Sequence, residues 1–331
     1  MFPTKLLRFV TLGACMFTVT LWVGSNSFFQ SPSLAQTATA PSSAKMVSDD
    51  YIGSEACKDC HEDQFKNFSH TAHAKIATAS GWKNKVTGCE TCHGPGKAHA
   101  AEGDPTKIQN PAKMKAHEAS ARCQTCHAQM NEHAIWRGSK HESAGLSCLS
   151  CHSSHRKSAA GNPAQLFANM QSETKMLKLR TQEETCFQCH GEMRKAQFQR
   201  STHLFRNEDR ESRMTCSQCH EPHGSIGPKM MRTANINETC YTCHAEKRGP
   251  FLWEHSPTRE NCMTCHKPHG SNNTNLLIAR APMLCQQCHI QGRHQTVAGR
   301  PNSGFILNRA CLNCHSQVHG SNHPSGILLQ R

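Results

Sequence analysis

The sequence is short of the residues that build hydrophobic cores. Aromatic residues make up 6% of its 331 residues, apolar residues of all types only 36%, and the mean hydropathy is −0.63. A soluble domain usually has close to half of its residues apolar, so side chains alone cannot form a core for a chain of this length. The 21 cysteines exclude an ordinary cytosolic enzyme, in which so many thiols would be a redox hazard.

Long apolar runs are scarce as well. An uncharged apolar stretch runs from Phe9 to Gly24 behind Lys5 and Arg8, and it falls short of the ~20 residues that a transmembrane helix needs. Because small residues follow at Ser33-Leu34-Ala35, we predict a cleavable secretory signal peptide over residues 1–35 and an exported chain of 296 residues (331 − 35). Leu12-Gly13-Ala14-Cys15 faintly resembles a lipoprotein signal, but the apolar run continues past Cys15.

After the predicted cleavage site the chain changes character. Residues 36–52 are rich in Ala, Ser and Thr, and we expect a flexible leader there. Residues 53–331 have no apolar span of ~20 residues and no alternating pattern of barrel strands, so we do not expect this part to cross a bilayer unaided.

All twenty cysteines beyond the signal peptide belong to C-x-x-C-H motifs. This motif attaches c-type haem, because two thioethers fasten one porphyrin and the adjacent imidazole then binds the iron. Zinc sites and disulfides also use paired cysteines, but neither requires a histidine directly after each pair. We therefore predict ten covalently bound haem c groups. The cysteines are Cys57, Cys60, Cys89, Cys92, Cys123, Cys126, Cys148, Cys151, Cys186, Cys189, Cys216, Cys219, Cys240, Cys243, Cys262, Cys265, Cys285, Cys288, Cys311 and Cys314, and the motif histidines are His61, His93, His127, His152, His190, His220, His244, His266, His289 and His315.

Ten of the fourteen other histidines recur at fixed places around these motifs. An isolated one would be read as a surface imidazole, but the recurrence predicts second, distal iron ligands. Five precede the second motif of a pair and five follow it: His73, His141, His203, His255 and His294, then His99, His155, His223, His269 and His319. His70 competes with His73, which we favour because it shares an aromatic-x-x-[Ser/Thr]-x-His pattern with His141 and His203.

This recurrence divides the chain into five modules of two haems each, starting near residues 57, 123, 186, 240 and 285. A histidine that lies three residues past a motif histidine points away from that haem. We therefore expect distal ligands to serve neighbouring haems and so to tie the modules together. His70, His117, His133 and His323 are left over.

The predicted iron ligands indicate whether the haems can activate a substrate. If every iron has two imidazoles, none has the open position that substrate activation requires. The methionines show no register that would make them ligands, and the carboxylate pair Glu183-Glu184 lies at a predicted helix start with no catalytic partner nearby. The sequence favours an electron-transfer protein over a multihaem reductase, and it predicts no catalytic residue.

The formal net charge of +13 would suit a nucleic-acid binder if it stood alone. Ten haems, however, would bring roughly −20 from propionates and about +10 from ferric cores, which nearly cancels the protein charge. We therefore expect no nucleic-acid partner.

The predicted fold is that of a multihaem cytochrome c. Ser54, the capping box of Thr181 and Glu184, and Pro282 mark starts of short helices before three of the motifs. Second motifs end in turns such as Glu221-Pro222-His223-Gly224. We expect short α-helices and loops wrapped around a chain of ten haems, little or no β-sheet, and one decahaem domain over residues 53–331.

The motif order, CYTCHAEKRGPFLWEH at 240–255, APMLCQQCH at 281–289 and CLNCHSQVHGSNHPSG at 311–326 resemble the MtrA/DmsE family of periplasmic decahaem cytochromes. The resemblance covers about residues 50–331. It implies haem ligation by the residues named above and insertion into an outer-membrane β-barrel porin. It also implies an extracellular multihaem cytochrome or terminal oxidoreductase on one side and a periplasmic or inner-membrane cytochrome on the other. The direction of electron flow is left open, and a soluble periplasmic shuttle between a quinol dehydrogenase and a reductase is the alternative.

Overall fold

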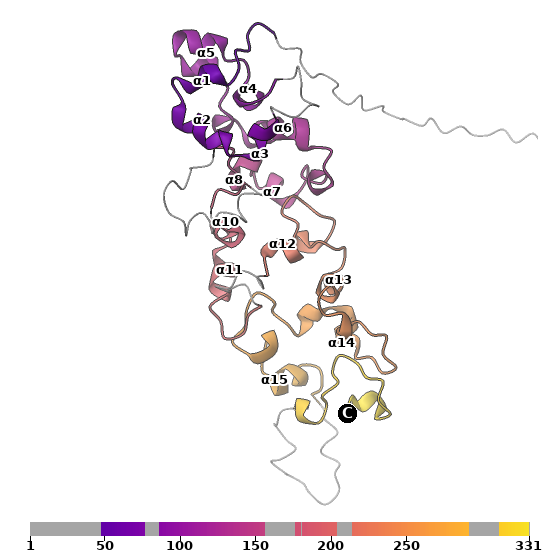
Figure 1. Cartoon of the computed structure of the whole chain (residues 1–331). Helices are drawn as coiled ribbons and strands as arrows, with labels where there is room; N and C mark the ends of the chain where they lie inside the picture. The colour runs from indigo at the N-terminus through magenta and orange to yellow at the C-terminus, as the bar shows by residue number, and fades with distance from the viewer. Residues whose placement is uncertain are drawn as a thin grey trace, which may run out of the picture. The chain divides into compact units, whose positions relative to one another are not determined.

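Short helices joined by loops make up the whole of the described chain (Figure 1). The computed structural model describes residues 48–76, 86–155, 176–179, 181–203, 214–290 and 311–330, all within the unit Ala44–Arg331. The predicted signal peptide and most of the predicted leader lie outside these ranges. The longest described helix has 12 residues, and only isolated β-bridges occur among the described residues. The predicted helical fold without a sheet is therefore confirmed.

Most α-helices either overlap a C-x-x-C-H motif or directly follow one. The α-helices are α1 (Glu55–Lys58), α2 (Glu62–Ser69), α3 (Ala72–Ile76), α4 (Cys89–His93), α5 (Lys97–Glu102), α6 (Ala116–His127), α7 (Lys140–Ser143), α8 (Cys148–Cys151), α10 (Gln182–Phe187), α11 (Gly191–Ala196), α12 (Cys216–Cys219), α13 (Ile236–Tyr241), α14 (Ser256–Glu260) and α15 (Ala281–Gln286). The 3-10 turns are η2 (Pro105–Lys107), η3 (Pro111–Lys113), η4 (Asn131–His133), η5 (Pro228–Met230), η6 (Ala245–Lys247), η7 (Cys262–Thr264), η8 (Thr274–Leu276), η10 (Cys311–Asn313) and η11 (Gly326–Leu328).

Helices begin at all three of the predicted starts, but the serine predicted to cap one of them makes no capping hydrogen bond. Thr181 and Glu184 form a reciprocal capping box at the start of α10, with N–H···O distances of 3.1 and 3.3 Å. Pro282 lies in the first turn of α15, where its missing N–H costs nothing. Ser54 precedes α1 but makes no cap bond there. Its hydroxyl instead accepts the N–H of Cys89 at 3.0 Å, so it joins two motifs.

The same device holds the two motifs of other modules together. Ser120 lies three residues before Cys123, and its Oγ accepts the N–H of Cys148 at 3.3 Å. Asn237, three residues before Cys240, accepts the N–H of Cys262 through Oδ1 at 2.8 Å. A polar side chain one turn before the first motif therefore fixes the start of the second, which places the two motifs against each other.

The second motifs that end at His220 and His266 are each followed by a tight turn that returns to the motif. His220 forms an isolated bridge with Met231, and the N–H of Glu221 donates to the Met230 carbonyl at 2.7 Å. Gly224 has a φ of +120° in this turn, and an added Cβ would lie 2.4 Å from the Ile135 carbonyl oxygen. Glycine is required there because the turn packs directly on the backbone of the preceding module.

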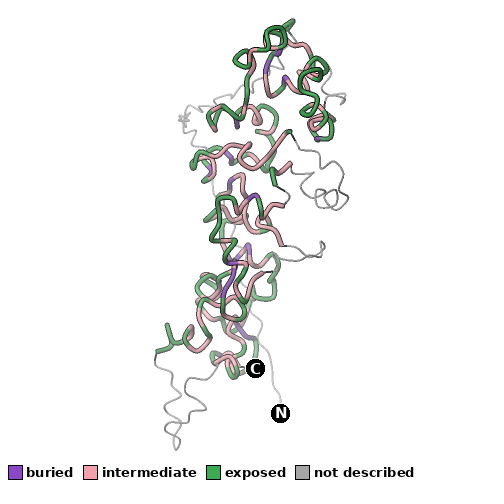
Figure 2. Tube along the Cα trace, turned by 90° about the vertical axis from the view of Figure 1, so that its left-hand side faces the viewer, coloured by how far each residue is buried: buried purple, intermediate pink, exposed green. Residues whose placement is uncertain are grey.

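Side chains form almost no core in the described residues. The buried apolar residues there are Ala119, Trp136 and Ala196. Large apolar side chains stand in solvent instead, among them Ile226 and Ile290 at 82% exposure. Purple buried segments are correspondingly few and scattered along the trace in Figure 2. This distribution agrees with the expectation that something other than side chains fills the interior.

Candidate haem sites

The cysteine pairs lie next to one another in sequence order. None of the twenty cysteines of the motifs forms a disulfide. Within each module the first cysteines of the two motifs are joined by a thiol hydrogen bond: Cys57 with Cys89, Cys123 with Cys148, Cys186 with Cys216, Cys240 with Cys262, and Cys285 with Cys311. Burial, followed by the charge of and hydrogen bond to Cys89, raises the pKa of the Cys57 thiol to about 11.

Successive modules approach one another through the other cysteine of the motif. Burial and then the nearby Cys126 raise the pKa of Cys92. The equivalent neighbours across the later boundaries are Cys151 with Cys189, Cys219 with Cys243, and Cys265 with Cys288. Each motif thus adjoins the motif before it and the motif after it.

Nine of the ten motif histidines face one of the predicted distal histidines. Their ring centres lie between 5.8 and 6.4 Å apart. The pairs are His61 with His99, His127 with His73, His93 with His155, His190 with His141, His152 with His223, His244 with His203, His220 with His269, His289 with His255, and His266 with His319. We name each site by its motif histidine, as in the His220 site.

These separations suit an iron between the rings. A coordinating imidazole nitrogen lies about 2 Å from the metal and the ring centre about 1 Å further, so two imidazoles on one iron have centres about 6 Å apart. The thioether positions of each motif precede one member of each pair in the chain. The residues therefore fit the group that the motifs imply.

The pairing runs across module boundaries, as the sequence suggested. A histidine between two motifs reaches forward, as His73 does to His127 of the next module. A histidine after the second motif reaches backward, as His155 does to His93 of the preceding module. His61 has no preceding module and pairs with His99 of its own. Two imidazole pairs therefore cross each of the four boundaries.

Two of the predicted distal ligands differ from the rest, one by its position in the chain and one by having an alternative. His294, the distal ligand predicted for the last module, lies outside the described residues. His73 is half-buried and lies 6.0 Å from His127, whereas His70 is exposed on the surface next to it. The geometry supports His73.

Burial favours the neutral form, which binds metal, in several of the paired imidazoles. Burial lowers the pKa of His73, His155, His223, His269 and His319. A neutral ring can ligate iron through one nitrogen and donate a hydrogen bond through the other.

Backbone carbonyls orient several of these rings. The Nδ1 atoms of His99, His141, His203 and His255 lie 2.7 to 3.0 Å from carbonyl oxygens, so Nε2 is the ring atom that would bind a metal. Motif histidines use the same arrangement: His93, His220, His266 and His315 approach the carbonyls of Gln109, Lys229, Asn275 and Leu328. No side-chain pattern encodes these carbonyl partners, so sequence reasoning could not find them.

Sequence reasoning also missed His133. It was counted as spare, yet its ring centre lies 5.6 Å from His127 and 4.4 Å from His223, and its Nδ1 is buried with no hydrogen-bond partner among the described residues. The His133–His223 separation is too short for an iron between the rings. His133 therefore lies beside two neighbouring sites as a contact of their ligands.

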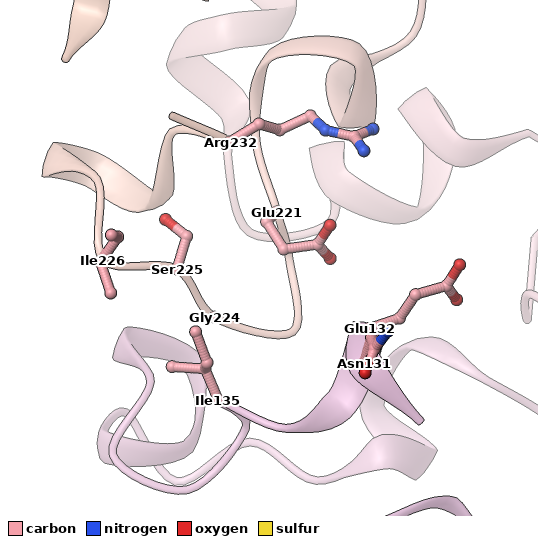
Figure 3. A pocket seen from close by; sticks show the side chains of 8 residues that line it. All are labelled: Asn131, Glu132, Ile135, Glu221, Gly224, Ser225, Ile226 and Arg232. Carbon is pink, nitrogen blue, oxygen red and sulfur yellow. The ribbon is translucent and has the colours of Figure 1, made fainter. Parts of the chain in front are cut away.

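A solvent-open pocket adjoins this place. Figure 3 shows Glu132 of η4 and Glu221 of the turn after His220 among its lining residues. Arg232 also lines it and donates to the Ser217 carbonyl at 3.0 Å. The pocket thus brings charged groups beside His223, a predicted ligand, which follows Glu221 by two residues.

This chain resembles known cytochromes. A family described as "Doubled CXXCH motif" matches residues 210–249 and 255–294, and "Cytochrome c554 and c-prime" matches residues 56–87. The "Multiheme cytochrome MtrA" of Shewanella baltica (strain OS185) is 41% identical over 294 residues, which cover 84% of this chain and 81% of the relative. The undecahaem cytochrome from the S-layer of Carboxydothermus ferrireducens is 22% identical with a TM-score of 0.13, over 75% of this chain and a third (33%) of that structure.

The motifs and the comparisons together define a multihaem c-type cytochrome, which is an electron-transfer protein rather than an enzyme. Its C-x-x-C-H motifs bind haem c. Given the extent of the identity, the chain belongs to the MtrA family of multihaem cytochromes. None of the described helices has both the length and the apolar character that a membrane span requires.

Proposed function

We propose that this protein carries ten haem c groups, each bound by two imidazoles, and passes electrons along them in the order of the sequence. The observation that carries the proposal is the set of nine imidazole pairs with centres 5.8 to 6.4 Å apart. The haem attachment residues are the twenty cysteines of the motifs. The axial ligands are the nine pairs, with His294 and His315 as the predicted pair of the last site.

The contacts between motifs support a continuous path. First cysteines meet within each module and second cysteines meet between modules, so every proposed haem has its sequence neighbours beside it. Two imidazoles on each iron leave no position for substrate, which favours relay over reduction. Six-coordinate irons also change little in structure when they gain or lose an electron.

Removal of one distal ligand tests the assignment. His269→Ala should leave the His220 site with a single imidazole, although His269 lies 49 positions further along the chain (269 − 220). Electron paramagnetic resonance of the ferric protein should then show one high-spin haem out of ten. His117→Ala is the control, because His117 is an exposed spare histidine. A wild-type spectrum for His269→Ala would refute this ligand pair.

We further propose that the protein is exported to the periplasm by its signal peptide and works at the outer membrane inside a β-barrel porin. There it would connect a periplasmic or inner-membrane cytochrome with an extracellular multihaem cytochrome or terminal oxidoreductase. The likeness to a relative named MtrA supports this role. The described helices offer no membrane span, so the conduit depends on the porin.

Reconstitution tests the conduit. The cytochrome and an outer-membrane β-barrel porin are placed in liposomes around a trapped redox dye, and an impermeant reductant is added outside. Dye reduction that requires both proteins is expected. Reduction by the porin alone, or none with both, would contradict the conduit, and a monomeric cytochrome that never co-purifies with a porin would favour a periplasmic shuttle.

A further inference from the structure

Two turns of the same backbone design carry opposite charges next to distal ligands. The sequences are Cys-His-Glu-Pro-His at 219–223 and Cys-His-Lys-Pro-His at 265–269. In both, the residue after the motif histidine donates its N–H to a carbonyl nine positions later, in the returning turn: Glu221 to Met230 and Lys267 to Leu276, each at 2.7 Å. The proline carbonyls also act alike, because Pro222 binds Nδ1 of His141 and Pro268 binds Nδ1 of His203.

The difference lies in what the variable side chain does to the following histidine. Glu221 Oε1 lies 3.2 Å from Nδ1 of His223, and both side chains are 24% exposed. This carboxylate therefore takes the place that a neutral carbonyl takes at His99, His141, His203 and His255. Glu192 and Glu246 approach His190 and His244 only to 3.8 Å and are 67% and 61% exposed, so solvent screens them more.

The equivalent position in the other turn carries a positive charge. Lys267 directly follows the motif histidine His266 and precedes His269 by two residues, as Glu221 precedes His223. Its side chain is exposed, and its backbone N–H donates to the Leu276 carbonyl in the same turn geometry. His223 thus has a carboxylate within hydrogen-bond distance, whereas the turn before His269 carries an ammonium group.

Other charges around Glu221 do not remove this contrast. Glu132 lines the same pocket (Figure 3) and adds negative charge. The Arg232 guanidinium donates to the Ser217 carbonyl.

Charge next to an axial imidazole acts on the iron. A carboxylate that accepts a hydrogen bond from a ligating histidine raises the basicity of that ligand and stabilises the more positive ferric state. Reduction adds one electron to the iron, with no bond formed or broken and no proton moved, so the ferrous state is disfavoured beside Glu221. A lysine has the opposite effect.

We propose that Glu221 and Lys267 are tuning residues that set a low reduction potential at the His152 site and a higher one at the His220 site. This inference rests on the proposed haem ligation. It makes the relay uneven, with a low-potential position fixed in the second module and a higher one in the third. In a Cys-His-x-Pro-His turn, the charge of the residue at position x then raises or lowers the reduction potential of the adjacent site.

A charge exchange in the full haem-loaded protein tests the proposal. Each turn already accommodates the other residue in its counterpart, so Glu221→Lys and Lys267→Glu should fold, and Glu221→Gln removes only the charge. The readout is an equilibrium redox titration followed by haem absorbance, with dithionite as reductant. Glu118→Lys is the control, because Glu118 is 51% exposed and approaches only the spare His117.

Opposite shifts are expected. Glu221→Lys should move one tenth of the haem absorbance to higher potential, by at least tenfold in the equilibrium constant, which is about 59 mV for one electron. Lys267→Glu should move one tenth to lower potential by less, because Lys267 is exposed, and Glu118→Lys should move none. Shifts in the same direction, or equal to the control, would overturn the tuning role.

His269→Ala separates the two levels of inference. If it produces a high-spin haem while the charge exchanges shift nothing, the ligation holds and only the tuning fails. If it produces no high-spin haem, the ligation fails and the tuning falls with it.

Discussion

Asn237 offers a quantitative test of how two motifs are held together. Its side chain is 3% exposed and makes three hydrogen bonds. Oδ1 accepts the N–H of Cys262 at 2.8 Å, and Nδ2 donates to the carbonyls of Thr258 and Arg259 at 3.2 and 3.0 Å. Both carbonyls lie near the end of α14, where they have no partner further along the helix. Asn237 thus joins α13, α14 and the start of the second motif of its module.

Asn237→Ala removes all three bonds. At a net value of about 1 kcal/mol for each, local stability should fall by about 3 kcal/mol, which corresponds to a ~100-fold increase in opening. Asn237→Ser should cost less, because serine occupies the same position before Cys123 and accepts the N–H of Cys148. Asn237→Asp should cost at least as much as alanine, because its second oxygen would face two carbonyl oxygens.

Hydrogen–deuterium exchange of the haem-loaded protein measures this locally, since exchange reports the opening of separate parts of a structure. The amide of Cys262 should exchange about 100-fold faster in Asn237→Ala and at an intermediate rate in Asn237→Ser. The amide of Cys148, held by Ser120, serves as the internal control. Unchanged exchange at Cys262, or equal acceleration at both cysteines, would refute the reasoning.

Three further outcomes are expected. The chain produced without haem attachment should show little helical circular dichroism, because only Ala119, Trp136 and Ala196 are buried apolar residues in the described part, and native helicity would contradict this. Glu90→Gln should lower the stability of the folded protein by ~1–3 kcal/mol. The Glu90 carboxylate accepts the N–H groups of Ile52, Gly53 and Gly96, and an amide cannot accept all three. Unchanged amide exchange at Gly53 would contradict this prediction. The low-spin ferric signals in electron paramagnetic resonance should fall into two classes, because near-parallel imidazole planes split the iron d-orbitals more than crossed planes do. Six ring pairs have interplanar angles of 5° to 23° and three have angles of 46° to 68°. A single class of signals would contradict the geometry.

Local patterns in the sequence predicted local structure well. The capping box of Thr181 and the position of Pro282 are found as expected, because both depend on residues within one helical turn. The place of His73 beside a motif histidine also followed from a short pattern. The helical fold without a sheet followed from the same short spacings between motifs.

Partners distant along the chain could not be predicted. Spacing indicated that His155 should serve another haem, but only the fold brings it to His93, since that pairing depends on how one module lies on the next. The position of His133 between His127 and His223 has the same origin. Ser54 was read as a helix start from its neighbours, whereas its hydroxyl binds a residue 35 positions away.

The crossing of imidazole pairs explains why so few apolar side chains suffice. At the boundary between the second and third modules, His141 reaches forward to His190 and His223 reaches backward to His152. With iron between the rings of each pair, the two modules cannot separate unless two coordinated irons lose a ligand. In the proposed ligation, covalent thioethers would hold each of these irons to one module and the distal imidazole would hold it to the adjacent module. The same bonds that would keep neighbouring haems close enough for electron transfer would then replace the hydrophobic core, and a chain built in this way has no need of the aromatic residues that its sequence lacks.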